Sequence, residues 1–167
     1  MIKSTRNQIG NAKNPYQGSF KKILTVCSAG LLRSATLQNY LIKNYDCNVR
    51  NCGTSESFAL IPLSEALYEW ADWIVFVNKE NFREGFGKEV QAPDWQEKGK
   101  KVIVLDIPDN YGFNDPKLLN IVDNQWKYIQ KQLVKYPDSE YIEYDSSNQV
   151  CCGDWDDEGK CKCQKDG

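Results

Sequence analysis

The chain has no histidine among its 167 residues. Serine or cysteine nucleophiles that depend on an imidazole base are therefore excluded, and so is any metal centre with histidine ligands. The sequence also has no apolar run long enough to cross a bilayer, and no apolar segment near its start that is typical of a secretory signal. We therefore expect no membrane partner.

The chain has seven cysteines, and because this number is odd they cannot all pair with one another in disulfides. This favours free thiols in a reducing, cytoplasmic setting. The charge is divided unevenly, since residues 136–167 carry a net charge of −6 and residues 1–135 a net charge of +4. A mildly basic body suits an anionic substrate, but its charge is too small to indicate nucleic acid binding.

The most informative segment is residues 27–34, with the sequence CSAGLLRS. The apolar run 23–26 before it is typical of a buried strand, and apolar residues spaced three and four apart in 37–45 after it indicate a helix. The segment thus joins the end of a strand to the start of a helix. A helix N-terminus presents unpaired N–H groups and a partial positive charge, which together suit a bound phosphate.

Each residue type in this segment has a chemical reason to be there. Cys27 would lie in the positive field, which lowers the pKa of a thiol and favours the nucleophilic thiolate. Arg33 can donate two parallel N–H bonds to phosphoryl oxygens, and Ser34 can donate to the Cys27 sulfur. The small residues Ala29 and Gly30 let the backbone approach the anion. The loop residues predicted to bind the substrate are Ser28, Ala29, Gly30, Leu31 and Leu32.

Strand and helix patterns alternate along residues 21–136. The predicted strands are 23–26, 47–52, 72–77 and 101–105, and the predicted helices are 37–45, 62–72, 79–87 and 116–136, with Asn78 and Asp115 as N-caps. This order predicts an α/β fold with a four-stranded parallel sheet flanked by helices in three layers. We interpret residues 1–20 as an N-terminal arm, 21–136 as the domain and 137–167 as an acidic, cysteine-containing tail.

A carboxylic acid near the loop would protonate a leaving oxygen and later activate water. The loop 106–114 follows a predicted strand, so it should lie on the same sheet edge as Cys27. It offers Asp106 and Asp109, and we favour Asp109 because Asp106, at the strand end, could instead cap or brace the loop. Tyr111 could flank an aromatic substrate.

Four segments resemble the low-molecular-weight protein tyrosine phosphatases: CSAGLLRS, NCGTS after the second strand, WADWIVFV, and VIVLDIPDNYGF. The resemblance covers about residues 22–135 and is closest to a small bacterial branch with a CSxxxLRS loop. It implies the family's four-stranded parallel sheet and hydrolysis of phosphotyrosine. It also implies that Cys27 is the nucleophile that forms a phosphocysteine, that Arg33 binds phosphate, that Ser34 tunes the thiolate and that Asp109 is the acid.

The chain departs from the main family inside the loop. A Gly-Asn pair in the family, whose Asn braces the loop, is replaced by Ala29 and Gly30, so bracing must come from elsewhere. A second loop cysteine, which protects the nucleophile in many members, is replaced by Leu32. The residue after Asp109 is Asn110 instead of proline.

The tail contains Cys151, Cys152, Cys161 and Cys163. Four thiolates can form a tetrahedral zinc site, so structural zinc is one candidate there, beside adventitious disulfides and a disordered tail with free thiols. No other cofactor is expected.

Several functions remain open besides a phosphatase acting on a phosphorylated protein. One is a phosphatase for a nucleotide or another small phosphoester. Another is arsenate reduction, which needs resolving thiols near the loop. A third is a phosphate-binding module without turnover.

Overall fold

The structure is a computed structural model that describes residues 19–86 and 100–148. The predicted N-terminal arm lies almost wholly outside these residues, and so do the four tail cysteines. The elements in chain order are β1 (Lys21–Cys27), α2 (Arg33–Asn44), β2 (Cys47–Gly53), α3 (Glu65–Trp70), β3 (Trp73–Phe76), α4 (Lys79–Phe86), β4 (Lys101–Val104), α6 (Pro116–Lys135), β5 (Tyr141–Glu143) and η1 (Ser146–Asn148).

The five strands form one parallel sheet in the order β2-β1-β3-β4-β5. The chain runs from β1 outward to β2 and then returns to the other side of β1 to form β3. The strand order therefore reverses beside β1, and ligands of doubly wound sheets bind outside the carboxyl ends of the strands at such a point. Cys27 is the last residue of β1, and in register it pairs with Gly53.

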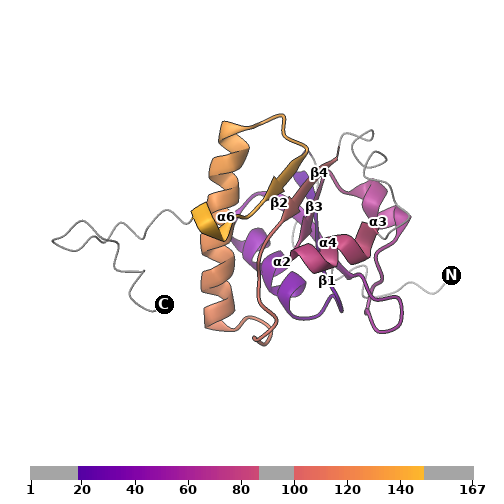
Figure 1. Cartoon of the computed structure of the whole chain (residues 1–167). Coiled ribbons are helices and arrows are strands. Elements are labelled where there is room, and N and C mark those ends of the chain that lie inside the picture. The colour runs from indigo at the N-terminus through magenta and orange to yellow at the C-terminus, as the bar shows by residue number, and fades with distance from the viewer. Residues whose placement is uncertain (1–18, 87–99, 149–167) are drawn as a thin grey trace.

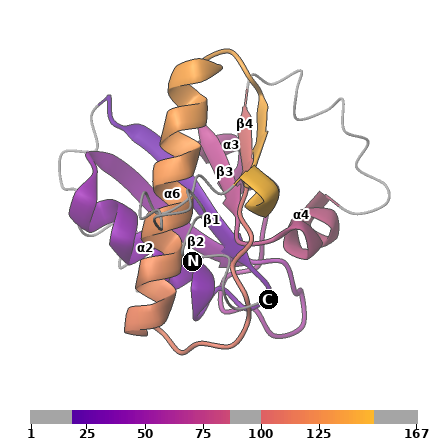
Figure 2. The same cartoon turned by 60° about the vertical axis from the view of Figure 1, so that its left-hand side comes forward.

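Alternation along the strands divides the core between the two faces of the sheet. On one face Ile23, Val49, Val75 and Ile103 pack against α2 and α6. On the other face Leu24, Ile74, Phe76 and Val104 pack against side chains of α3 and α4, including Leu67 and Phe82. Figures 1 and 2 show the resulting three layers, with α2 and α6 on one side of the sheet and α3 and α4 on the other. The predicted α/β class and its layers are confirmed.

The number of strands differs from the prediction, because the sheet has a fifth strand. β5 pairs in parallel with β4, and Val102 lies opposite Tyr141. The Lys101 ammonium group fixes the segment that precedes β5 by donating to the carbonyls of Pro137 and Ser139. Residues assigned to the tail on sequence grounds therefore belong to the sheet as far as Glu143.

Helix α3 also starts later than the helix predicted for residues 62–72. Pro62 does not open it but forms an isolated parallel bridge with Gly53. The helix α3 begins only at Glu65, where the Ser64 side chain accepts from the N–H of Leu67 at 3.4 Å. Extended pairing with β2 keeps the segment near Pro62 out of the helical conformation. The predicted caps Asn78 and Asp115 are confirmed, since Asn78 Oδ1 accepts from the N–H of Asn81 and Asp115 from that of Lys117.

No helix among residues 19–86 and 100–148 combines the length and apolarity that a membrane span requires.

Candidate active site

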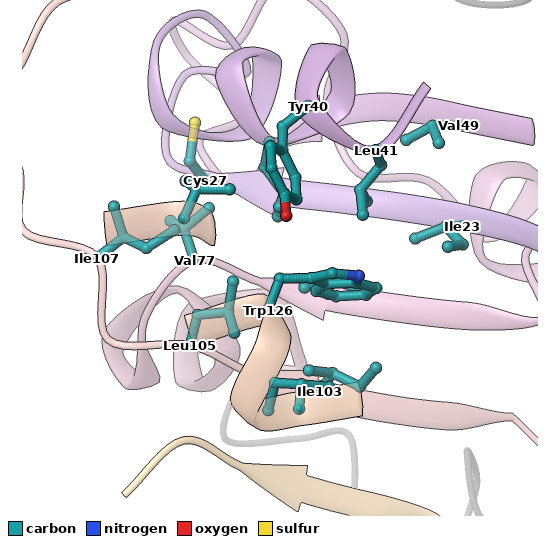
Figure 3. Packing of buried hydrophobic residues seen from close by; sticks show 14 of the residues in the cluster. Ile23, Cys27, Tyr40, Leu41, Val49, Val77, Ile103, Leu105, Ile107 and Trp126 are labelled. Atoms are coloured by element: carbon teal, nitrogen blue, oxygen red, sulfur yellow. The ribbon is translucent and has the colours of Figure 1, made fainter. Parts of the chain in front are cut away.

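Cys27 lies between the carboxyl end of β1 and the N-terminus of α2. Helix α2 has 12 residues, and its N-cap, Leu32, makes no side-chain capping bond. The first N–H groups of the helix are therefore left for another acceptor, such as an oxyanion. Figure 3 shows Cys27 at the margin of the core cluster, with its sulfur pointing away from Val77 and Ile107.

The Cys27 thiol is held by groups that favour its ionised form. Its Sγ lies 3.0 Å from the Ser34 hydroxyl oxygen and accepts from the N–H of Gly30 at 3.2 Å. Burial by itself raises the pKa of this thiol, but the bonds from Ser34 and from the loop amides outweigh it and hold the pKa below its ordinary value of 9.0. The sequence-based prediction of a lowered pKa thus has a direct physical cause here.

The two other cysteines in the described residues have the opposite electrostatics. Burial raises the pKa of Cys47 to about 11, with the nearby Asp46 carboxylate adding to the shift. Burial also raises the pKa of Cys52, and the Cys27 sulfur adds to that shift. Of these three thiols, Cys27 alone has a pKa held below its ordinary value, which favours its thiolate relative to the other two.

Two glycines let the loop and the sheet approach each other. Gly30 has φ of +71°, and a Cβ there would lie 3.0 Å from the Cys52 backbone. Gly53 lies under the loop, where a Cβ would be 2.3 Å from the Ser28 carbonyl oxygen. A rigid backbone surrounds both positions, so neither contact can be relieved by rotating a side chain.

Replacing Gly53 with alanine should therefore destabilise the protein by ~1–3 kcal/mol, the cost of overpacking, and push the loop away from β2. Thermal unfolding and the alkylation rate of Cys27 measure the two effects. Gly112→Ala is the matched control, because nothing lies within 4 Å of a Cβ placed there. Equal melting temperatures for the two variants would contradict the close approach.

The segment that follows β2 clamps the loop from outside. The N–H groups of Thr54, Ser55 and Leu60 donate to the carbonyls of Cys27, Ser28 and Ala29, at 2.8, 3.0 and 3.1 Å. With these three carbonyls turned outward and bonded, the loop N–H groups are left for the inner side. This backbone clamp supplies part of the bracing that the loop's own side chains do not provide.

Arg33 lies with its guanidinium buried at the end of the loop, and its side chain is 5% exposed. Its Nη1 donates to the Ile107 carbonyl at 3.3 Å, and its Nε lies 3.1 Å from the Asp109 carboxylate. A guanidinium has five N–H donors. Among the described residues, the remaining donors of Arg33 have no protein acceptor within bonding distance.

The two candidate acids lie in different places. The Asp109 carboxylate contacts Arg33, and its side chain is 68% exposed. The Asp106 side chain is also exposed, but it lines a separate cavity of about 480 Å³ together with Lys79 and Glu143. The structure therefore brings Asp109, and not Asp106, to the arginine of the Cys27 loop.

The three loops that meet at this site expose large apolar side chains. These are Leu31 and Leu32 of the Cys27 loop, Phe58 and Leu60 of the segment after β2, and Phe113 of the Asp109 loop. Tyr111, predicted to flank a substrate, is partly buried and packs against the core cluster. The aromatic ring that the Asp109 loop exposes is that of Phe113, which is 51% exposed.

No family model and no curated protein matches the chain. Solved structures with a similar fold exist. The structure of Wzb from Vibrio vulnificus in complex with benzylphosphonate has a TM-score of 0.48 at 20% identity, with 69% of this chain and 100% of that chain covered. The structure of a YwlE mutant from Bacillus subtilis has a TM-score of 0.46 at 18% identity, with 71% and 99% covered. A thioredoxin-dependent arsenate reductase from Corynebacterium glutamicum has a TM-score of 0.45 at 14% identity, with 78% and 71% covered.

These likenesses concern the fold alone. The positions of the other thiols bear on arsenate reduction. Cys47 pairs with Lys21 at the opposite end of the strands from Cys27, and Cys52 lies in the core cluster on the other face of the sheet. Burial also raises the pKa of both thiols, which disfavours the thiolate that exchange with Cys27 would require. The four tail cysteines lie outside the described residues.

Sequence reasoning did not identify some residues that hold the site. The Gln125 side chain of α6 bonds the backbone N–H and carbonyl of Asp106 at 2.8 and 2.7 Å, and so fixes the start of the Asp109 loop. The sequence did place a polar residue at position 125 on the apolar face of the predicted helix, and this pattern could have indicated a buried side chain that bonds a loop. Asn81 of α4, which is 1% exposed, bonds Ser28 and carried no signal beyond a helical position.

Proposed function

We propose that this chain is a cysteine-dependent phosphomonoesterase of the low-molecular-weight tyrosine phosphatase type, acting on phosphotyrosine in proteins. One observation carries the proposal. A cysteine sulfur lies 3.0 Å from the Ser34 hydroxyl oxygen and accepts from a loop amide, and the same eight-residue segment carries a buried guanidinium whose remaining donors meet no acceptor among the described residues. This arrangement supports a thiolate nucleophile beside a phosphate-binding site.

The reaction would proceed in two steps. The Cys27 thiolate attacks phosphorus, the bond from phosphorus to the ester oxygen breaks, and the Asp109 carboxyl gives its proton to the leaving oxygen. Water then attacks the phosphocysteine, Asp109 takes the proton, and the P–S bond breaks to restore the thiolate. Arg33 and the loop amides hold the non-bridging oxygens, and Ser34 stabilises sulfur as it leaves.

Before substrate binds, the Arg33 guanidinium forms an ion pair with the Asp109 carboxylate. A phosphate group that bonds the guanidinium would replace Asp109 as its anionic partner. The Asp109 carboxyl would then be released from Arg33 to face the leaving oxygen, as the first step requires.

The exposed apolar side chains of the three loops at the site favour an aromatic group on a protein over a nucleotide. Leu31 of the Cys27 loop, Phe58 of the segment after β2 and Phe113 of the Asp109 loop expose apolar side chains that the organic part of a phosphoester could contact. Aromatic and aliphatic side chains offer a phosphotyrosine ring favourable contact but give ribose and base few hydrogen bonds. A reducing, cytoplasmic setting fits a thiolate nucleophile and is part of the proposal.

A substrate panel tests the proposal. Initial rates are measured on a phosphotyrosine peptide, a nucleoside monophosphate and, with a thiol reductant, arsenate. We expect the phosphotyrosine peptide to be hydrolysed with the highest kcat/KM. Preference for the nucleotide would support the small-phosphoester alternative, and thiol-dependent turnover of arsenate would support the reductase. Phosphate binding without hydrolysis of any ester would mean a binding module.

Asp109→Asn should lower kcat on phenyl phosphate by about 10²–10⁴, the usual contribution of a general acid. The loss should be smaller on 4-nitrophenyl phosphate, whose leaving group needs little protonation. Asp106→Asn is the matched control and should retain the wild-type rates. If Asp109→Asn keeps its rate on phenyl phosphate while Asp106→Asn does not, Asp106 and not Asp109 is the general acid.

A further inference from the structure

Asn81 is a buried residue of α4, the helix that lies on the opposite face of the sheet from α2, and its side-chain amide bonds the Cys27 loop. It lies in the first turn of α4 and is 1% exposed. Its Nδ2 donates to the Ser28 hydroxyl oxygen at 2.8 Å and to the Glu84 carboxylate at 3.2 Å. Both amide hydrogens are therefore used, one of them on the residue next to the nucleophile.

The orientation of this amide is determined by Glu84. A carboxylate only accepts hydrogen bonds, so the nitrogen of Asn81 must face it. The Asn81 Oδ1 atom is then left buried with no partner among the described residues. Leaving a buried acceptor unbonded is unfavourable, and the reverse orientation would place that oxygen against the carboxylate. The amide is thus held for its donors.

Glu84 also connects this amide to the backbone clamp. The carboxylate oxygen that accepts from Asn81 accepts from the Thr54 hydroxyl as well, at 2.7 Å. The N–H of Thr54 donates to the Cys27 carbonyl. A continuous chain of contacts therefore runs from Cys27 through Thr54, Glu84 and Asn81 to Ser28.

We propose that Asn81 is a positioning residue that fixes the Ser28 end of the phosphate loop, and that Glu84 holds Asn81 in the required orientation. Ala29 and Gly30 have no polar side chain with which to brace the loop from within. Ser34 braces its far end by contact with the Cys27 sulfur. The side-chain amide of Asn81 supports the other end of the loop by donating to Ser28. The inference rests on the proposed function, because it assumes that the loop binds phosphate.

A double-mutant cycle tests whether Asn81 acts through Ser28. Asn81→Ala, Ser28→Ala and the double variant are compared by the Ki of inorganic phosphate and by the pH midpoint of Cys27 alkylation. We expect each single variant to weaken phosphate binding by about three- to tenfold, the size expected for one hydrogen bond, and to move the midpoint upward. The double variant should be no worse than either single variant.

Two further variants separate positioning from stability. Ser64→Ala removes the cap of α3, and Ser64 bonds neither Asn81 nor Ser28, so this variant should lower the melting temperature but leave the alkylation midpoint unchanged. Glu84→Ala alters an exposed side chain and should move the midpoint in the same direction as Asn81→Ala, by less.

Additive losses in the double variant, or an unchanged midpoint in both Asn81→Ala and Glu84→Ala, would overturn the proposal. Alkylation and phosphate binding do not require turnover. A wild-type protein that binds phosphate but hydrolyses no ester would therefore refute the proposed phosphatase and still allow this inference to be judged.

Discussion

Replacing Cys27 with serine should abolish hydrolysis while phosphate binding remains. The change exchanges one sulfur for oxygen inside an otherwise unaltered loop, so the loop amides and Arg33 still hold the anion. A serine hydroxyl is far less acidic than a thiol, and no histidine exists in the chain to act as its base. We expect kcat on a phosphotyrosine peptide to fall by at least about a thousandfold.

Initial rates and phosphate binding by calorimetry measure the two halves of this prediction. Cys47→Ala is the matched control, because that thiol lies at the far end of the strands and its pKa is raised to about 11. It should retain the wild-type rate, whatever its effect on stability. Activity that survives in Cys27→Ser and disappears in Cys47→Ala would mean that the nucleophile is elsewhere.

Replacing Arg33 with lysine should lower kcat/KM by about 10²–10³, the loss typical of removing a donor to transition-state charge. Lysine keeps the positive charge but lacks the planar group that bonds Ile107, Asp109 and a phosphate oxygen together. A charge-only role would leave the variant nearly as active as wild type. The geometric role that we infer requires a large loss.

The kinetics of Arg33→Lys are measured on an aryl phosphate, with the Ki of inorganic phosphate as the binding readout. Arg83→Lys is the control, since Arg83 is an exposed arginine of α4. It should change neither value appreciably. Equal activity of Arg33→Lys and Arg83→Lys would contradict the assignment of Arg33 to the phosphate.

The central part of the site could be predicted because its residues are close in the chain. Cys27, Ser34 and Arg33 lie within one loop, and the apolar run before it and the helical spacing after it are strong local patterns. The helix α6 begins at Pro116 behind the cap Asp115, as its sequence predicts. Asp109 meets Arg33 because both of their loops follow strands of one parallel sheet.

Other features depend on pairings that no local pattern contains. β5 has only three residues, Tyr141–Glu143, and forms because β4 offers an open edge beside it. The contact between Asn81 and Ser28 joins residues 53 positions apart. The need for glycine at position 53 arises from the loop that crosses above it, whereas the sequence there indicates only the end of a strand. Such constraints come from tertiary packing.

The most direct measurement is the pH dependence of Cys27 alkylation by iodoacetamide, followed on the Cys27 peptide by mass spectrometry with and without inorganic phosphate. The pKa of Cys27 is held below 9.0, so its thiolate persists as the pH falls below that value. We predict an alkylation midpoint below 9.0 and slower alkylation when phosphate occupies the loop. A midpoint at or above 9.0, together with no protection by phosphate, would contradict a phosphate cradle built around an ionised sulfur.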